Sequence, residues 1–199
     1  MVEEQVAVEL QHINVKLLLK YSSDLSLDAV VPILHGWIQE QAFDELLIDV
    51  ADYQHVKDGP GVVLIGHEAD YSLDNTDGRL GVRYNRKAPF AGSNLDRLIQ
   101  ATRSALLACQ RLEQDEIPNG KFAFNGHAIE LAVNDRLIAP NSEETRLALD
   151  PELRAFLVKL FAGTKYSLSY ETDPRRLFGA TVHSERAFST EELLQNLSG

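Results

Sequence analysis

Residues 46–87 read LLIDVADYQHVKDGPGVVLIGHEADYSLDNTDGRLGVRYNRK, and this stretch decides the fold. Two nearly continuous apolar runs, at 46–50 and 62–66, are typical of central strands that are covered on both faces. The run at 79–86 alternates apolar and polar residues, which is typical of a strand with one buried face. We therefore expect three strands here, and we allow the second strand an extension to Ser72 as an alternative.

Turn sequences separate these runs. Gly59, Pro60 and Gly61 break the chain before the second run, and DNTDG at 74–78 precedes the third. A short turn between two strands favours an antiparallel hairpin, so we expect 62–66 to pair with 79–86. The sequence Asn125-Gly126 is the strongest signal for a two-residue hairpin, and we expect it to join strands at 121–124 and 127–133.

The remaining elements follow from periodicity and capping signals. We expect a strand at 12–20, a helix ending near Ala42, and a helix beginning after Ser93, with Asp96 three residues on. Further along we expect a short helix at 142–149, a helix beginning at Asp150, a hairpin at 166–171 and 178–183, and a short helix after Ser189. This order predicts an α+β fold: a mostly antiparallel sheet with three hairpins, three main helices and a short C-terminal helix.

The length of 199 residues suits a single domain over 1–199, although a composition break at 117–120 could separate two subdomains. The net charge of −11 disfavours DNA and RNA as partners, because binding them requires phosphate neutralisation by Lys and Arg. The sequence contains neither a signal peptide nor a membrane-spanning apolar run, and its single cysteine, Cys109, has no internal disulfide partner. We expect a cytoplasmic protein that does not bind membranes and that could form a homo-oligomer.

One group of polar residues is a candidate catalytic site. Asp49 interrupts an apolar run, so we expect it to be buried and to accept at least two hydrogen bonds. If the ends of the first two strands converged, carboxylate and imidazole groups would meet in one cleft, as a divalent metal or general acid–base chemistry requires. The members of this candidate site are Asp49, Asp52, His55, His67 and Glu68.

The spacing of this group matches no metal-binding motif, and ordinary strand-end residues would explain it equally well. His67 and Glu68 should lie on opposite faces of a continuous strand, so a shared site requires the strand to bulge or end at Gly66. We favour regular alternation, and therefore expect no bound metal or other cofactor.

A basic group in this acidic chain is a candidate ligand site. Arg79, Arg83 and Lys87 share one face of the predicted third strand, with Asn85 between them. Such a face could bind an anionic ligand or an acidic partner. Salt bridges to neighbouring acids are the alternative, and they are common on solvated sheet faces.

The string IDVADYxHVxxGPGVxLIGHEADYSLD resembles a bacterial protein family of unknown function, over about residues 30–88. The resemblance implies a bacterial, cytoplasmic protein and supplies no site residues. From the residues themselves, the leading hypothesis is a non-catalytic module that binds a protein or a small molecule. The alternatives are a metal-assisted, hydrolase-like enzyme using the Asp/His/Glu group, and a regulator that binds an anionic metabolite through Arg79, Arg83 and Lys87.

Overall fold

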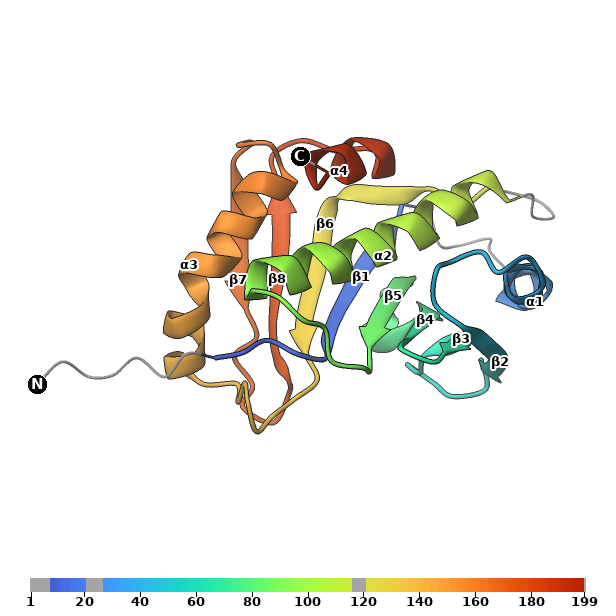
Figure 1. Ribbon diagram of the computed structural model, residues 1–199, viewed down its shortest axis with the longest axis horizontal. Helices are drawn as coiled ribbons and strands as arrows, with labels where there is room; N and C mark the ends of the chain where they lie inside the picture. The colour runs from blue at the N-terminus through green and yellow to red at the C-terminus, as the bar shows by residue number, and fades with distance from the viewer. Residues whose placement is uncertain (1–7, 21–26, 116–120, 199) are drawn as a thin grey trace, which may run out of the picture.

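The computed structural model describes residues 8–20, 27–115 and 121–198, and within them the chain forms one eight-stranded antiparallel sheet with helices (Figure 1). The α+β class is therefore confirmed. The predicted subdomain break at 117–120 lies outside the described residues. The strand order in the sheet is β2-β3-β4-β5-β1-β6-β8-β7. The strands are β1 Ile13–Leu19, β2 Leu47–Tyr53, β3 Gly61–Gly66, β4 Ala69–Asp74, β5 Gly81–Arg86, β6 Phe124–Val133, β7 Tyr166–Tyr170 and β8 Phe178–Ser184. The α-helices are α1 Val30–Glu40, α2 Asn94–Gln114, α3 Glu143–Leu160 and α4 Thr190–Asn196.

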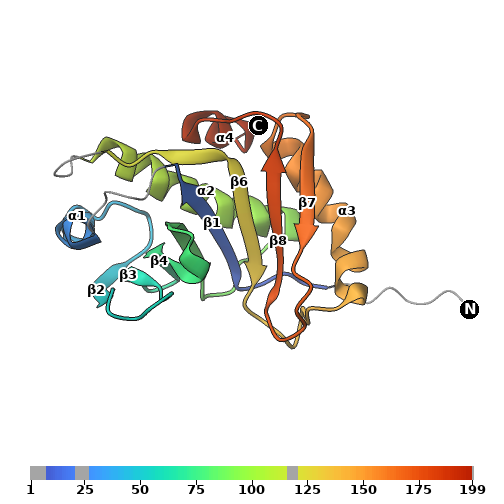
Figure 2. The same ribbon diagram turned by 180° about the vertical axis from the view of Figure 1, so that it is seen from behind.

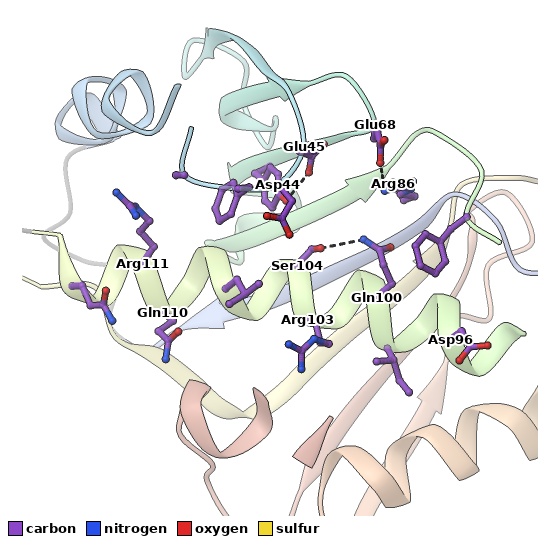
Figure 3. A pocket seen from close by; sticks show the side chains of 17 residues that line it. Asp44, Glu45, Glu68, Arg86, Asp96, Gln100, Arg103, Ser104, Gln110 and Arg111 are labelled. Atoms are coloured by element: carbon purple, nitrogen blue, oxygen red, sulfur yellow. Dashed lines mark hydrogen bonds and ion pairs between the residues drawn. The ribbon is translucent and has the colours of Figure 1, made fainter. Parts of the chain in front are cut away.

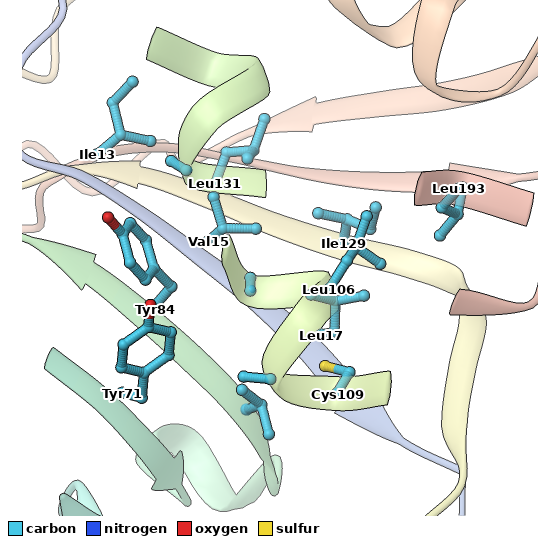
Figure 4. Close-up of a cluster of buried hydrophobic side chains, with 14 of the residues drawn as sticks. Ile13, Val15, Leu17, Tyr71, Tyr84, Leu106, Cys109, Ile129, Leu131 and Leu193 are labelled. Atoms are coloured by element: carbon cyan, nitrogen blue, oxygen red, sulfur yellow. The ribbon is translucent and has the colours of Figure 1, made fainter. Parts of the chain in front are cut away.

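Helix α2 covers the middle of the sheet. Its start is the predicted capping box: Ser93 Oγ accepts from the Asp96 backbone N–H, and Asp96 Oδ2 accepts from the Ser93 N–H at 2.8 Å. Its apolar stripe, which includes Leu106 and the buried Cys109, packs against strands β1 and β5 (Figure 4). Burial raises the pKa of the Cys109 thiol, as expected for a cysteine in an apolar core.

The helices leave one face of the sheet uncovered. Figures 1 and 2 show α2 and α3 on the same side of the strands, α4 packs against α2, and α1 packs against β2 and β3. Seen from behind in Figure 2, strands β1, β6 and β8 lie in front of α2. We call the side away from α2 the open face. Odd-numbered residues of β1, such as Val15, face the core, so the even-numbered Asn14 and Lys16 face the open side.

Strand β2 is an edge strand, which corrects the expectation that it is central and that Asp49 is buried. Asp49 is exposed, and its carboxylate accepts a 2.8 Å hydrogen bond from the adjacent Val50 N–H. The apolar run was misleading because Leu46 and Ile48 are also exposed, at 62% and 54%. Only Leu47 of this segment is buried against the sheet.

The second strand does not continue to Ser72. It ends at Gly66, and His67 and Glu68 form a tight turn into β4, so they do not alternate along one strand. The predicted pairing of 62–66 with 79–86 is therefore wrong, because β4 lies between them and pairs with both. The turn contains no Asn-Gly or Asp-Gly signal, and Gly66, where a shared site would require a bulge or a strand end, is the residue at which the strand stops.

The predicted hairpin at Asn125-Gly126 is also wrong. Strand β6 continues through both residues, at an irregular step in its pairing with β1, where Leu17 lies opposite Ile129 and Leu19 opposite Phe124. Gly126 accepts a backbone hydrogen bond from Phe188, and a Cβ atom there would overlap the Phe188 carbonyl oxygen. The glycine is thus required by close backbone approach and not by a turn.

The C-terminal third is closer to expectation. The hairpin of β7 and β8 is confirmed, and Ser189 with Glu192 caps α4 as predicted. The two helices expected at 142–149 and from Asp150 are instead one helix, α3, with Pro151 inside it. Ser142 is the N-cap, whereas the Asp150 carboxylate accepts from Arg154 and from the Tyr170 hydroxyl.

Candidate functional site

The predicted catalytic residues do not come together. In the antiparallel pair β2–β3, the end of β2 meets the start of β3, with Tyr53 opposite Gly61. His55 follows that end, whereas His67 lies beside Leu46 at the other end, where its N–H donates to the Leu46 carbonyl. Five residue steps of about 3.4 Å separate the two ends, or about 17 Å.

The separation follows from the direction of the strands. The C-terminal ends of two successive strands lie at the same edge of a parallel sheet but at opposite edges of an antiparallel pair. Asp49 and Asp52 lie along exposed β2, and Glu68 forms an ion pair with Arg86 at 3.0 Å. Within residues 8–20, 27–115 and 121–198, no three His, Cys, Asp or Glu side chains are arranged to hold a metal ion.

A cavity of about 540 Å³ lies on the open face and gathers cationic side chains. Six of the nineteen Lys and Arg residues of the chain line it: Lys16, Arg79, Arg83, Arg136, Arg175 and Arg176. Three carboxylates, of Asp77, Glu130 and Glu171, also line it. Five of the six cations are ion-paired with five carboxylates, those of Asp74, Glu130, Asp173, Asp77 and Glu171. Six cations against five acids still leave a local excess of positive charge in a chain of net charge −11.

The floor of this cavity is a row of polar residues across the sheet. Lys16 lies in register between Arg83 of β5 and Glu130 of β6. Glu130 in turn lies opposite Thr181 of β8, which lies opposite Ser169 of β7. Strand pairing thus places side chains from segments more than 150 residues apart in one line, since paired residues point to the same face.

Asp74 organises the cationic part of the floor. It is fully buried, and it accepts hydrogen bonds from Lys16 Nζ at 2.6 Å and Arg83 Nη1 at 3.1 Å, and from the Thr76 hydroxyl at 2.9 Å. Lys16 is only 2% exposed. Burial lowers the pKa of Lys16, and the Asp74 carboxylate opposes that shift. Asp74 therefore has the role that the sequence analysis assigned to Asp49.

Two turns border the cavity, one from each end of the strands. The β4–β5 turn follows Asp74, and the β7–β8 turn precedes Phe178, which pairs with Val133 at the far end of β6. The turns meet over the face through an ion pair between Asp77 and Arg176. Arg79 of the first turn pairs with Glu130 on the floor at 2.9 Å.

Several polar atoms in this region lack partners among the described residues. Asn14 is only 8% exposed, lines the cavity, and has a buried Oδ1 atom with no hydrogen-bond partner there. The Nε atom of Arg83 and the Oδ1 atom of Asn85 are also buried and unpartnered in that sense. Buried polar atoms are normally hydrogen-bonded, so the Arg83 Nε–H is available to an acceptor in the cavity, whereas the two amide oxygens require a donor such as ordered water.

The predicted ligand residues are thus divided. Arg79 and Arg83 line the cavity, and Asn85 lies on the same face as Arg83. Lys87 does not line it, because its Nζ donates to Asp70 at 2.6 Å and to the Gly66 carbonyl at 2.7 Å. The functional candidates not predicted from the sequence are Asn14, Lys16, Asp74, Glu130, Arg136, Arg175 and Arg176. For Asn14 and Lys16 the sequence does contain a signal, because both are polar residues at alternating positions of β1. Their partners across the strand pair, Asn85 and Arg83 of β5, are also polar.

In the described part of the chain, no helix combines the length and the apolar character that crossing a bilayer requires. Comparison with protein-family models, with curated proteins and with solved structures finds no match to this chain.

Proposed function

We propose that this protein is a non-catalytic binding module whose open face binds a small anionic molecule that carries phosphate or carboxylate groups. The supporting observation is the cavity of about 540 Å³ lined by six cationic side chains in an otherwise acidic chain. Its volume is in the range of small-molecule sites. Five of the six cations are arginines, whose planar guanidinium groups bind carboxylate and phosphate through two parallel hydrogen bonds.

Two alternative functions are less well supported. Nucleic acid would require an extended basic surface, whereas the cations here gather around one open cavity between two turns. The metal-assisted alternative gains no support, since its predicted residues lie apart on the exposed side of β2 and in two turns. The proposal keeps two of the three basic residues predicted from sequence and replaces Lys87 with Lys16 and the arginines of the rim.

Calorimetric titration at low ionic strength, where exposed charges are least screened, tests the proposal. The probes are inorganic phosphate, pyrophosphate and citrate, with chloride as the reference anion. Arg136→Gln removes an exposed rim cation, and Lys87→Gln removes the same charge from outside the cavity. We expect Arg136→Gln to weaken binding about tenfold, the usual value of a hydrogen bond to a charged group, and Lys87→Gln to change it little.

Two results would overturn the proposal. One is that none of the polyvalent anions binds the wild-type protein more tightly than chloride does. The other is that Lys87→Gln weakens binding as much as Arg136→Gln, because the effect would then reflect overall charge and not this cavity.

A further inference from the structure

A second, larger hollow lies on the helix-covered side of the sheet (Figure 3). It has a volume of about 840 Å³ and runs along one side of α2, from Asp96 to Gln114. The segment Ala42–Glu45, which precedes β2, forms the opposite wall together with side chains from β4 and β5. We call it the α2 groove. It is separate from the open-face cavity because the sheet lies between them.

Glu45 carries an unusual charge in this groove. Its Oε1 accepts from the Tyr71 hydroxyl at 2.6 Å, and its Oε2 accepts from the Ala69 N–H at 2.9 Å. Both donors are neutral, and no cationic side chain in the described residues lies within ion-pair distance of this carboxylate. Burial raises its pKa. A partly buried carboxylate without a cation is complementary to a positively charged ligand.

The three arginines of the groove are already engaged. Arg86 pairs with Glu68 at 3.0 Å, Arg103 donates to the Ser198 hydroxyl at 2.6 Å, and Arg111 pairs with Glu40. Two further acids, Asp44 and Asp96, line the groove. None of these arginines is ion-paired with Glu45, although the positive charge of Arg86 partly offsets the effect of burial on the pKa of Glu45. With Asp44 beside it, Glu45 leaves a carboxylate in the groove that no cation pairs with in the described residues.

Aromatic and aliphatic side chains stand next to Glu45. Phe43, which is half-buried, stacks on Tyr71 with ring centroids 4.7 Å apart, and both rings line the groove. On α2, Ile99 and Leu107 present apolar surface, and Leu107 is 40% exposed. An ammonium group gains energy beside aromatic rings, and an attached apolar body gains energy against aliphatic side chains.

From these contacts we infer that the α2 groove binds an organic cation, with the ammonium group at Glu45 and the apolar body along Phe43 and Leu107. This site is independent of the proposed anion site, since it lies on the other side of the sheet and selects the opposite charge. A variant that no longer binds the cation should therefore still bind the anion, and the reverse.

Titration followed by two-dimensional NMR tests the inference with three probes of one shape: phenethylammonium, the neutral phenethyl alcohol and the anion 3-phenylpropionate. We expect the ammonium to bind the wild type and to shift the amide signals of Ala69 and Ser104. We expect the alcohol and the anion to bind at least about tenfold more weakly, since neither has a charge complementary to Glu45.

Glu45→Gln keeps the shape and one oxygen acceptor but removes the charge, and Glu185→Gln removes a charge from an exposed position outside the groove. We expect Glu45→Gln to abolish the preference for ammonium over alcohol, and Glu185→Gln to retain it. Should Glu45→Gln not fold, Leu107→Ser on the exposed side of α2 takes its place, with at least a several-fold loss expected. Absence of ammonium binding to the wild type, equal binding of all three probes, or shifts confined to the open face would overturn the inference.

Discussion

Asp74 is the residue on which the open face depends most. It is fully buried, and its carboxylate holds the Lys16 ammonium, the Arg83 guanidinium and the Thr76 hydroxyl together. A buried ion pair adds little net stability over an apolar pair, but removing one partner leaves the other charge buried and uncompensated. Replacing Asp74 alone should therefore lower the stability by more than the intact ion pair adds to it relative to an apolar pair.

We expect Asp74→Asn to lower the free energy of unfolding by about 3–5 kcal/mol, because the amide keeps an acceptor oxygen but leaves the buried Lys16 ammonium without a compensating negative charge. Urea unfolding monitored by circular dichroism measures this loss. The matched control is the double variant Lys16→Met, Asp74→Leu, which removes the fully buried pair and leaves only the partly exposed Arg83 without its carboxylate, so it should recover part of the stability. A single-variant loss below about 1 kcal/mol would contradict a buried pair.

Glu45 provides a prediction of pH dependence. Because burial raises its pKa above 4.5, the folded protein retains this proton at pH values where the unfolded chain has lost it. The contribution of Glu45 to stability is therefore full below pH 4.5 and falls as the pH rises through the raised pKa. We expect the stability of the wild type relative to Glu45→Gln to decrease over that range, as measured by urea unfolding at several pH values. A difference that is constant with pH, or that increases with it, would show the opposite sign.

At the scale of elements, Gly126 shows how a tertiary contact selects a residue within a strand. A Cβ atom at this position would overlap the backbone of Phe188. We expect Gly126→Ala to destabilise the protein by about 1–3 kcal/mol, because β6 and the segment before α4 must separate. Gly36, in the interior of α1, has no atom within 4 Å of the same position, so Gly36→Ala should stabilise by about 0.5–1 kcal/mol. Thermal unfolding of the two variants measures both effects, and equal shifts of the same sign would refute the contact.

The edge strand β2 provides a second prediction for an element. Asp49 uses its carboxylate to occupy the Val50 N–H at the free edge of the sheet, beside exposed Ile48. Charged residues on edge strands hinder pairing with other chains. We expect Asp49→Val to self-associate with increasing concentration, as measured by analytical ultracentrifugation. Glu185→Val, which removes the same charge outside the edge strands, should remain like the wild type, and self-association of both variants would point to lost charge alone.

At the scale of the whole molecule, the sheet curves so that the β4–β5 and β7–β8 turns meet over the open face. Asp77 of one turn occupies the Arg176 guanidinium of the other, and that guanidinium lowers the pKa of Asp77. An anionic ligand at the proposed site must compete with Asp77 for Arg176. We therefore expect the Asp77–Arg176 contact to weaken the affinity for the anion, but not to be required for the site.

We expect Asp77→Asn to tighten the binding of pyrophosphate by up to about fivefold, the usual range of an exposed ion pair. Calorimetric titration measures the change. Asp58→Asn is the control, because it removes the same charge from the β2–β3 turn, and asparagine tolerates its positive φ of 53°. Weaker binding by Asp77→Asn would indicate that the turn contact builds the site. If the wild type binds no anion, the proposed function itself fails.

Local signals in the sequence were sufficient for the class of the fold and for most of its elements. The Ser93 and Ser189 capping boxes, the apolar stripe of α2 and the β7–β8 hairpin each depend on residues close in the chain, so they are legible without tertiary structure. The same locality explains two of the errors. The apolar run around Asp49 and the Asn125-Gly126 pair carry strong local signals that the sheet overrides.

The tertiary structure alone decided which strands are edges, which residues are neighbours and where charge accumulates. The order of the strands makes β2 an edge and leaves Asp49 exposed, whereas it places Asp74 under a turn in the interior. The cationic cavity combines β1, β5, β6, β7 and β8 with turns up to 99 residues apart. Pairing across the sheet depends on the free energy of packing the whole chain, and no window of neighbouring residues contains that information.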